Sequence, residues 1–358
     1  MCLCCCFECL PNVPPFNLIL HQFSHSLTPQ QEETEEREAM ASILVPNPIP
    51  SPTEDAQTIR EAVQGLGTDE KALIQVLGRR TASQRAEIAR SYERLYNESL
   101  IDRLYSELSG DFGKAMVLWA MDPAARDAKL AHEALHNDGD RRPSVVVEVA
   151  CASSPDHLIA VRKAYCSLFS SSIEEEIASC SAYEEPLKQF LVRLVSSYRY
   201  VGENVDDNLA RSEAAELCDA IRKKQPLNDE VIRIISSRNK SQLKATFQHY
   251  KQDHGKSIDE DIEKHSSRKL SGVLKVAVWC LVSPEKHFAE VVRSSIQGFG
   301  TDEDSLTRAI VCRAEIDMNK IKEEYKIRYK TTLTRDVIGD TSGDYKDILL
   351  TLVGNEVP

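Results

Sequence analysis

The stretch Gly65-Leu66-Gly67-Thr68-Asp69-Glu70 returns almost unchanged 233 residues later, as Gly298-Phe299-Gly300-Thr301-Asp302-Glu303. Glycine reaches backbone conformations that are closed to other residues, so a pair of glycines can turn several carbonyl oxygens toward one point. We expect Thr68 and Thr301 to cap the helix that follows each loop. Each copy therefore predicts the end of one helix, a tight glycine loop and the start of a second helix.

An acidic residue follows both loops at the same distance. Glu107 lies 40 residues after Gly67, and Asp340 lies 40 residues after Gly300. Carbonyl oxygens together with a carboxylate are the ligands that calcium prefers. Ordinary helix-end glycines would explain the loops but not the matched acids. The spacing therefore predicts a calcium site in each copy.

Four tyrosines reveal an internal repeat. Each of them stands seven residues before a Ser or Thr that is followed by an aliphatic residue; they are Tyr92, Tyr165, Tyr250 and Tyr325. Offsets of 73, 158 and 233 residues from the first copy define four units, and the apolar residues within them recur at helical spacing. We expect an all-α protein made of four stacked or ringed bundles of about five helices each.

The units are bounded as follows: residues 54–121, 122–197, 206–280 and 283–355, after a lead-in at 40–53. The valine-rich residues 144–149 favour a strand by propensity. Their position in the repeat corresponds to a helical stretch of the first unit, so we expect a helix.

The two middle units lack the loop signature. At the same offsets the second unit has Asp138, Asp140 and Cys180, with Gly139 one residue out of place. The third unit has Lys223, Gln225 and His265. We therefore expect calcium sites only in the first and fourth units.

The residue between each glycine pair is apolar, Leu66 in one loop and Phe299 in the other. Two apolar loop tips beside two cation sites indicate a shared face that meets a membrane, where lipid phosphates would complete the metal shell. We expect Leu66 and Phe299 to contact the membrane.

Composition limits the possible partners. The chain of 358 residues has a formal net charge of -12, which argues against nucleic-acid binding. An acidic membrane would repel such a protein unless a cation bridged the two. No stretch approaches the roughly 20 apolar residues of a membrane span. The cysteines spread through the body of the chain indicate reduced thiols, and hence a cytoplasmic protein that is peripheral at membranes when calcium is raised.

Residues 1–39 differ from the rest of the chain. Five of their first nine residues are cysteines, and an acidic run follows. The spacing Cys6-Phe7-Glu8-Cys9 admits a palmitoylated or metal-binding leader. We favour an extension that is disordered or not part of the mature protein, with Met40 as the natural start.

The sequence resembles the annexin family, and most closely its plant branch, over about residues 40–357. The loop motifs with Glu107 and Asp340 carry the likeness, together with Asp340-Thr341-Ser342-Gly343-Asp344-Tyr345, Trp119-Ala120-Met121-Asp122-Pro123 and Val195-Ser196-Ser197-Tyr198-Arg199-Tyr200. The resemblance implies an all-helical disc of four repeats with calcium sites on its convex face, which binds acidic phospholipid reversibly when calcium is present. We expect a monomer or weak oligomer.

The resemblance also implies which residues hold the calcium ions. In the first repeat, carbonyls of Val63, Gly65 and Gly67 would join the Glu107 carboxylate. In the fourth, Ile296, Gly298 and Gly300 would join Asp340. The pairs Thr68 with Glu70 and Thr301 with Glu303 match weaker accessory sites.

Two other sequence motifs suggest different functions. His132-Glu133-Ala134-Leu135-His136 matches a zinc hydrolase motif, but Arg142 stands where the extended motif needs a third histidine, which favours a chance match. Ile232-Arg233-Ile234 resembles a tripeptide linked to actin binding in plant annexins, although a helix with a buried face explains it as well. The alternatives to lipid binding are thus an actin-binding or ion-conducting adaptor, and less favourably a zinc hydrolase.

The residues implied in two redox activities of the family are only partly present. A histidine implied as a haem ligand is replaced by Arg79, which argues against peroxidase activity. Cys151 and Cys280 match cysteines suggested to be redox-active, but buried cysteines are usually inert. We expect no enzymatic activity.

Overall fold

The computed structural model describes residues 39–65, 67–137, 142–298 and 300–356. This part of the chain contains twenty α-helices and no β-strand, which confirms the expected all-α class. None of these helices is both long enough and apolar enough to cross a membrane. The leader, Leu66, Phe299, Asp138 and Asp140 lie outside the described residues.

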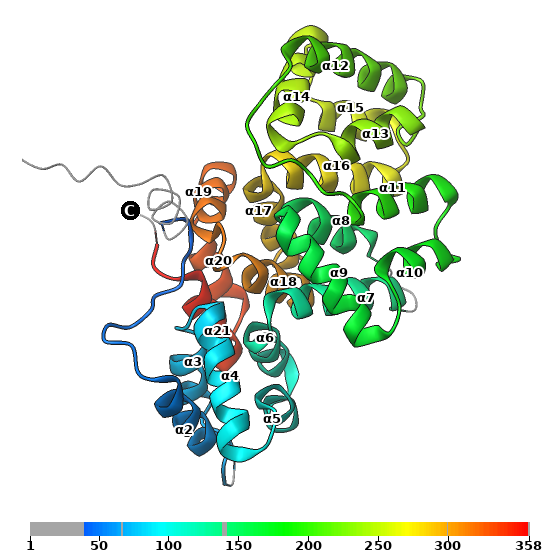
Figure 1. The fold of residues 1–358 in the computed structure, drawn as a ribbon. Helices are drawn as coiled ribbons and strands as arrows, with labels where there is room; N and C mark the ends of the chain where they lie inside the picture. Colours follow the sequence, from blue (N-terminus) through cyan, green and yellow to red (C-terminus); the bar gives the residue numbers. More distant parts are fainter. Residues whose placement is uncertain (1–38, 66, 138–141, 299, 357–358) are drawn as a thin grey trace, which may run out of the picture.

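The helices follow one another in four groups of five (Figure 1). The first group is α2 (Pro52–Ala62), α3 (Glu70–Leu77), α4 (Ala82–Tyr96), α5 (Leu100–Glu107) and α6 (Gly110–Ala120). The second group is α7 (Pro123–His136), α8 (Pro143–Ala152), α9 (Pro155–Phe169), α10 (Ile173–Ser179) and α11 (Glu185–Val195).

The other two groups have the same order of long and short helices. The third is α12 (Asp207–Arg222), α13 (Asp229–Ser237), α14 (Lys240–His254), α15 (Ile258–His265) and α16 (Arg268–Val282). The fourth is α17 (Pro284–Ser295), α18 (Glu303–Arg313), α19 (Met318–Tyr329), α20 (Leu333–Asp340) and α21 (Gly343–Val353). We call these groups repeats 1 to 4.

The repeats pack in pairs that are not consecutive in sequence. The apolar residues of repeats 1 and 4 form one core, and those of repeats 2 and 3 form another. Accordingly, in Figure 1 the blue and cyan helices of repeat 1 lie against the orange and red helices of repeat 4. Glu148 of α8 links the two halves, because it contacts both His287 of α17 and Arg308 of α18.

Helix α8 confirms the prediction that residues 144–149 are helical. The repeat indicated a helix there, although the propensity of these residues favours a strand. Pro143 occupies its first turn, where a missing N–H costs nothing. Val146 and Val147 are fully buried and Val145 nearly so. Every residue from Val145 to Cys151 is buried, so neighbours cover this helix on all sides and tertiary packing overrides the strand preference of valine.

The lead-in at 40–53 is fixed to repeat 4. The Ser42 amide and hydroxyl both donate hydrogen bonds to the Ala314 carbonyl, at 2.9 and 3.1 Å. The Asn319 side-chain amide donates to the carbonyls of Ala39 and Ala41. This segment therefore runs across repeat 4 before it enters α2 of repeat 1.

Candidate metal centre

The two glycine loops have the same backbone geometry. Gly65 and Gly67 have φ angles of 121° and 95°, and Gly298 and Gly300 have 129° and 92°. Side-chain-bearing residues rarely adopt these angles, whereas a Cβ atom at any of the four glycines would meet nothing within 4 Å. The glycines are thus required by backbone conformation and not by crowding, because there is open space beside each of the four.

Each loop is closed by the same hydrogen bond. The Asp69 amide donates to the Ala62 carbonyl and the Asp302 amide donates to the Ser295 carbonyl, both at 2.8 Å. Asp69 and Asp302, rather than the expected Thr68 and Thr301, are the N-cap residues of the next helices. Their carboxylates reach the amides of Ala72 and Ser305, which places the helix start one residue later than expected. The prediction of threonine caps was therefore wrong.

In repeat 1 the expected ligands Val63 and Glu107 share one guanidinium. Arg103 donates a hydrogen bond to the Val63 carbonyl at 2.6 Å, and the same terminal nitrogen lies 2.9 Å from a Glu107 carboxylate oxygen. The carbonyl at the end of α2 and the carboxylate at the end of α5 are thus directed at a common cation. These donor groups fit a hard cation such as calcium, and Arg103 occupies that place in this structure.

In repeat 4 the carboxylate reaches the loop without an arginine. The Thr301 hydroxyl donates to the Asp340 carboxylate at 2.6 Å and lies 3.3 Å from the Asp340 carbonyl. The side chain of Asp340 is exposed at the C-terminus of α20. Asp340 is therefore beside Thr301 of the glycine loop, and among the described residues no hydrogen bond or ion pair engages its second carboxylate oxygen.

The difference between the two loops comes from one position. Arg103 stands four residues before Glu107, and Asp336 stands four residues before Asp340. Asp336 accepts hydrogen bonds from Arg293 at 2.7 Å and from the Tyr325 hydroxyl at 2.8 Å. Arg103 and Asp336 are 233 residues apart and therefore correspond, so the sequence holds a signal for this difference between the loops, which our sequence analysis missed.

The other predicted ligands surround these loops. Ile296, at the C-cap of α17, is placed as Val63 is at the C-cap of α2. Thr68 and Glu70 border the start of α3, and Glu303 is the first residue of α18; all three are partly exposed. The carbonyl of Glu303 accepts a hydrogen bond from Tyr345 at 3.1 Å, so that backbone oxygen is engaged within repeat 4.

The middle repeats place different groups at the corresponding positions. Cys180 is the C-cap residue of α10 and carries no carboxylate. His265 ends α15 and directs its Nδ1 to the Asp261 carbonyl at 3.0 Å. Lys223 is the C-cap residue of α12, and its amine lies 3.3 Å from the Asp219 carboxylate. In these described residues the donor set of repeats 1 and 4 is not repeated.

The actin-related tripeptide is part of a packed helix. Ile232 and Ile234 are 3% and 0% exposed on α13, and Ile235 is also buried. Arg233 contacts carboxylate oxygens of Glu213, Glu216 and Glu230. The helix interpretation of Ile232-Arg233-Ile234 thus explains all three side chains without a partner protein.

The two candidate redox cysteines lie in the core. Burial raises the pKa of Cys151 to about 11 and that of Cys280 well above its ordinary value. Both thiols therefore stay protonated at neutral pH, whereas the thiolate is the reactive form. Their surroundings argue against a redox role.

The two histidines of the zinc motif lie at the end of α7, and both face Glu176, a residue outside the motif. His132 Nδ1 and His136 Nε2 lie 3.2 and 3.5 Å from the same carboxylate oxygen of Glu176 on α10. Glu133, the motif's own acid, is half-exposed and lies 3.8 Å from Lys129. The sequence could not supply Glu176, because it comes from another helix.

Comparison with known proteins agrees with this architecture. The family model described as Annexin matches residues 54–119, 212–277 and 287–352. Annexin D3 of Arabidopsis thaliana is 51% identical over 323 residues, which cover 89% of this chain and all of that protein.

Solved structures share the fold. Annexin III superposes with a TM-score of 0.82 at 30% identity, covering 88% of this chain and 98% of the other. A calcium-bound structure of annexin (Sm)1 superposes with a TM-score of 0.74 at 28% identity, covering 86% and 91%. The four repeats therefore form the curved disc of that fold. The chain belongs to the annexin family of calcium-dependent phospholipid-binding proteins and is of the plant type.

Proposed function

We propose that this protein binds acidic phospholipid membranes reversibly when calcium is present, through the glycine loops of repeats 1 and 4. The observation that carries the proposal is the matched pair of loops, each with two glycines at positive φ and an acid from another helix nearby. Asp340 accepts a hydrogen bond from Thr301 of its loop, and Glu107 shares the Arg103 guanidinium with the Val63 carbonyl. We assign Val63, Gly65, Gly67 and Glu107 to one site, and Ile296, Gly298, Gly300 and Asp340 to the other. Thr68 with Glu70, and Thr301 with Glu303, are the proposed accessory ligands.

Each part of the chain has a separate task in this function. The glycines would let the loop carbonyls turn toward one ion, while Glu107 at the end of α5 and Asp340 at the end of α20 would supply the carboxylates. Calcium, when bound, would join these oxygens to lipid phosphates. Charge makes such a bridge necessary, because a protein of formal net charge -12 is repelled by an acidic membrane. We propose that Leu66 and Phe299 enter the headgroup region and that the protein is cytoplasmic until calcium rises.

Co-sedimentation with vesicles tests the proposed function. The full chain is mixed with phosphatidylserine vesicles or with phosphatidylcholine vesicles across a calcium titration, and a chelator is then added. We expect the protein to pellet with phosphatidylserine only when calcium is present and to return to solution on chelation. Binding that is independent of calcium, or no binding at all, would refute the proposal.

Arg103 makes the two loops unequal. Its guanidinium must leave the Val63 carbonyl and the Glu107 carboxylate before these groups can hold another cation. A charged hydrogen bond contributes about 1.5–3 kcal/mol, and each 1.4 kcal/mol is a factor of ten in affinity. We therefore propose that repeat 4 responds to lower calcium concentrations than repeat 1.

Removing the guanidinium should sensitise repeat 1. With repeat 4 inactivated by Asp340→Asn, the further change Arg103→Ala is expected to lower the calcium concentration for half-maximal vesicle binding on the order of tenfold. Arg94→Ala is the matched control, because it removes the same charge from an arginine that contacts Ser91 instead of the loop. If Arg103→Ala weakened binding, the guanidinium would be a positioning group for Glu107 and not a competitor.

A further inference from the structure

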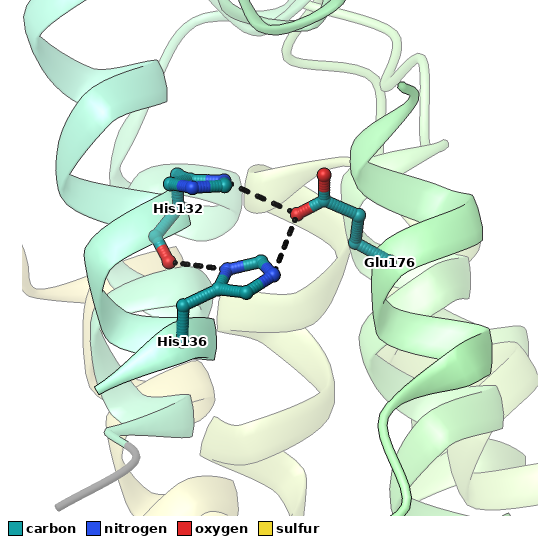
Figure 2. A group of neighbouring side chains, drawn as sticks. All are labelled: His132, His136 and Glu176. Atoms are coloured by element: carbon teal, nitrogen blue, oxygen red, sulfur yellow. Dashed lines mark hydrogen bonds and ion pairs between the residues drawn. The ribbon is translucent and has the colours of Figure 1, made fainter. Parts of the chain in front are cut away.

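A second group of potential metal ligands lies in repeat 2, the repeat that lacks the glycine pair. Figure 2 shows His132 and His136, one turn apart on α7, directed at the same oxygen of Glu176 on α10. One ligand atom from each of the three residues lies within 4.8 Å of the other two. Glu176 is largely buried, with 14% of its side chain exposed, and His132 is only 28% exposed.

The same place in repeats 1 and 4 is occupied by an arginine and a glutamine. In repeat 1 the Arg60 guanidinium contacts the Tyr92 hydroxyl at 3.2 Å and lies over the Tyr96 ring. Gln64, with its amide oxygen turned inward, accepts from Arg60 at 2.8 Å. The pair is four residues apart on α2, as the two histidines are on α7.

Repeat 4 has the same Arg–Tyr–Gln contacts. Arg293 contacts the Tyr325 hydroxyl at 3.4 Å, lies over the Tyr329 ring and donates to Gln297. The Asp336 carboxylate completes this group at 2.7 Å from Arg293. In both repeats the guanidinium thus lies against a tyrosine hydroxyl and a carboxylate. In repeat 1 that carboxylate is Glu98, 2.7 Å from Arg60, and Arg103 stands where repeat 4 has Asp336.

In repeat 2 the two histidines take over both positions. His132 Nδ1 lies 3.1 Å from the Tyr165 hydroxyl, and its ring stacks on Phe169 at 3.8 Å between centroids. Glu176 accepts a hydrogen bond from Tyr165, as Asp336 does from Tyr325. His132 therefore corresponds to Arg60 and Arg293, and His136 corresponds to Gln64 and Gln297.

This exchange leaves the carboxylate without a permanent positive partner. Arginine is charged at any working pH, whereas an imidazole is charged only when it is protonated. Among the described residues, Glu176 forms ion pairs with the two histidines and with no lysine or arginine. A largely buried carboxylate needs a positive partner, and two neutral imidazoles beside it are ligands for a metal cation.

The geometry suits a tetrahedral metal. Bonds of 2.0–2.1 Å place tetrahedral ligands about 3.3 Å apart. The two nitrogen–oxygen distances, 3.2 and 3.5 Å, are close to that value. The His136 Nδ1 lies 2.9 Å from the His132 carbonyl, which fixes Nδ1 as the donor and leaves the lone pair of Nε2 facing Glu176. Imidazole nitrogens select zinc over calcium, which binds oxygen.

We propose that His132, His136 and Glu176 bind a zinc ion that joins α7 to α10 and takes the place of the arginine found in repeats 1 and 4. Three protein ligands leave a fourth position to water. The proposal concerns metal binding and not hydrolysis, since Glu133 is paired with Lys129 and the third ligand comes from α10.

The chain itself supplies the matched variant. His132→Arg combined with His136→Gln recreates the Arg–Gln pair that repeats 1 and 4 already hold against a tyrosine, so this variant is expected to fold. Glu176→Gln removes the third ligand alone. His254→Gln is the control. His254 packs edge-on against Tyr250 of repeat 3, in the place of Phe169, and the described residues place it in no group of metal ligands.

The test is equilibrium dialysis of the full chain against zinc alone, with calcium removed. Cysteines elsewhere contribute equally to every variant, so the difference in bound zinc is the readout. We expect the double variant His132→Arg/His136→Gln to bind one equivalent of zinc less than the unchanged protein. Glu176→Gln should bind that equivalent of zinc at least tenfold more weakly. The control His254→Gln should bind as much zinc as the unchanged protein. Zinc should also raise the Tm of the unchanged protein more than that of the double variant. Equal zinc stoichiometry in the double variant and the unchanged protein would overturn the proposal.

Discussion

Replacing Glu107 by Gln and Asp340 by Asn together is expected to abolish calcium-dependent binding to phosphatidylserine vesicles. Each substitution keeps the size of the side chain and removes the carboxylate charge that the proposed sites require. Loss of a residue that only orients a metal ligand typically lowers metal affinity 10–100-fold. Loss of a ligand itself should therefore lower calcium affinity at least about 100-fold at each site. Co-sedimentation across a calcium titration measures the effect.

The fold should survive these two changes. Glu107 and Asp340 are at the C-terminal ends of α5 and α20, and both are at least partly exposed. Circular dichroism is therefore expected to show unchanged helical content. Each single variant should retain binding at higher calcium concentrations, because two loops on one membrane reinforce each other.

The control variant removes the same two charges elsewhere. Glu93 and Asp156 are exposed acids on α4 and α9, so Glu93→Gln with Asp156→Asn changes the net charge equally without altering either loop. We expect this control to bind as the unchanged protein does. Full binding by the Glu107/Asp340 double variant would contradict the site assignment, whatever the control showed.

The largest effect on stability is expected from Glu148→Ala. Glu148 is 6% exposed and lies between His287 at 2.8 Å and the Arg308 guanidinium, so it joins repeat 2 to repeat 4. Truncation would leave Arg308, itself only 8% exposed, without this carboxylate. Removing one partner of a buried ion pair typically lowers the free energy of unfolding by about 3–5 kcal/mol. Urea unfolding followed by circular dichroism measures this loss.

The pH dependence of the same group gives a second measurement. Burial alone would raise the pKa of Glu148, but Arg308 and His287 outweigh it and hold the pKa below its usual value. A carboxyl with a depressed folded-state pKa stabilises the protein above its unfolded pKa, and this stability is lost as the pH falls toward the folded value. The difference in stability between the unchanged protein and Glu148→Ala should therefore shrink below about pH 4.3.

Glu133→Ala is the comparison for Glu148→Ala. Glu133 is half-exposed and its nearest cation, Lys129, is 3.8 Å away. Exposed pairs of this kind contribute about 0–1 kcal/mol. A loss below about 1 kcal/mol for Glu148→Ala would show that the two halves of the molecule do not depend on this buried pair.

Much of the fold could be predicted from the internal repeat. The tyrosine register fixed the helix assignment of residues 144–149, where local propensity indicated a strand, and α8 confirms it. Repetition helps because each unit must bury the same face, so a clear unit informs an ambiguous one. The helix starts at Glu70 and Glu303 were missed by one residue, since threonine and aspartate are both good N-caps and only backbone geometry decides between them.

The contacts around the sites could be predicted only in part. The glycines and the acids have a sequence signal, but Arg103 becomes meaningful only when α5 is folded against the end of α2. The zinc motif likewise names His132 and His136 but not Glu176, which is 40 residues beyond His136 and on a different helix. Side chains that meet only through tertiary packing have no fixed spacing in the sequence, so their contacts cannot be predicted from it.

A crystal structure of the full chain grown with calcium tests the central claim most directly. Anomalous scattering would locate each bound calcium ion. We predict one ion held by the carbonyls of the Gly65–Gly67 loop with Glu107, with Arg103 displaced, and a second held by the Gly298–Gly300 loop with Asp340. Calcium in neither loop, or only in repeats 2 and 3, would contradict the account.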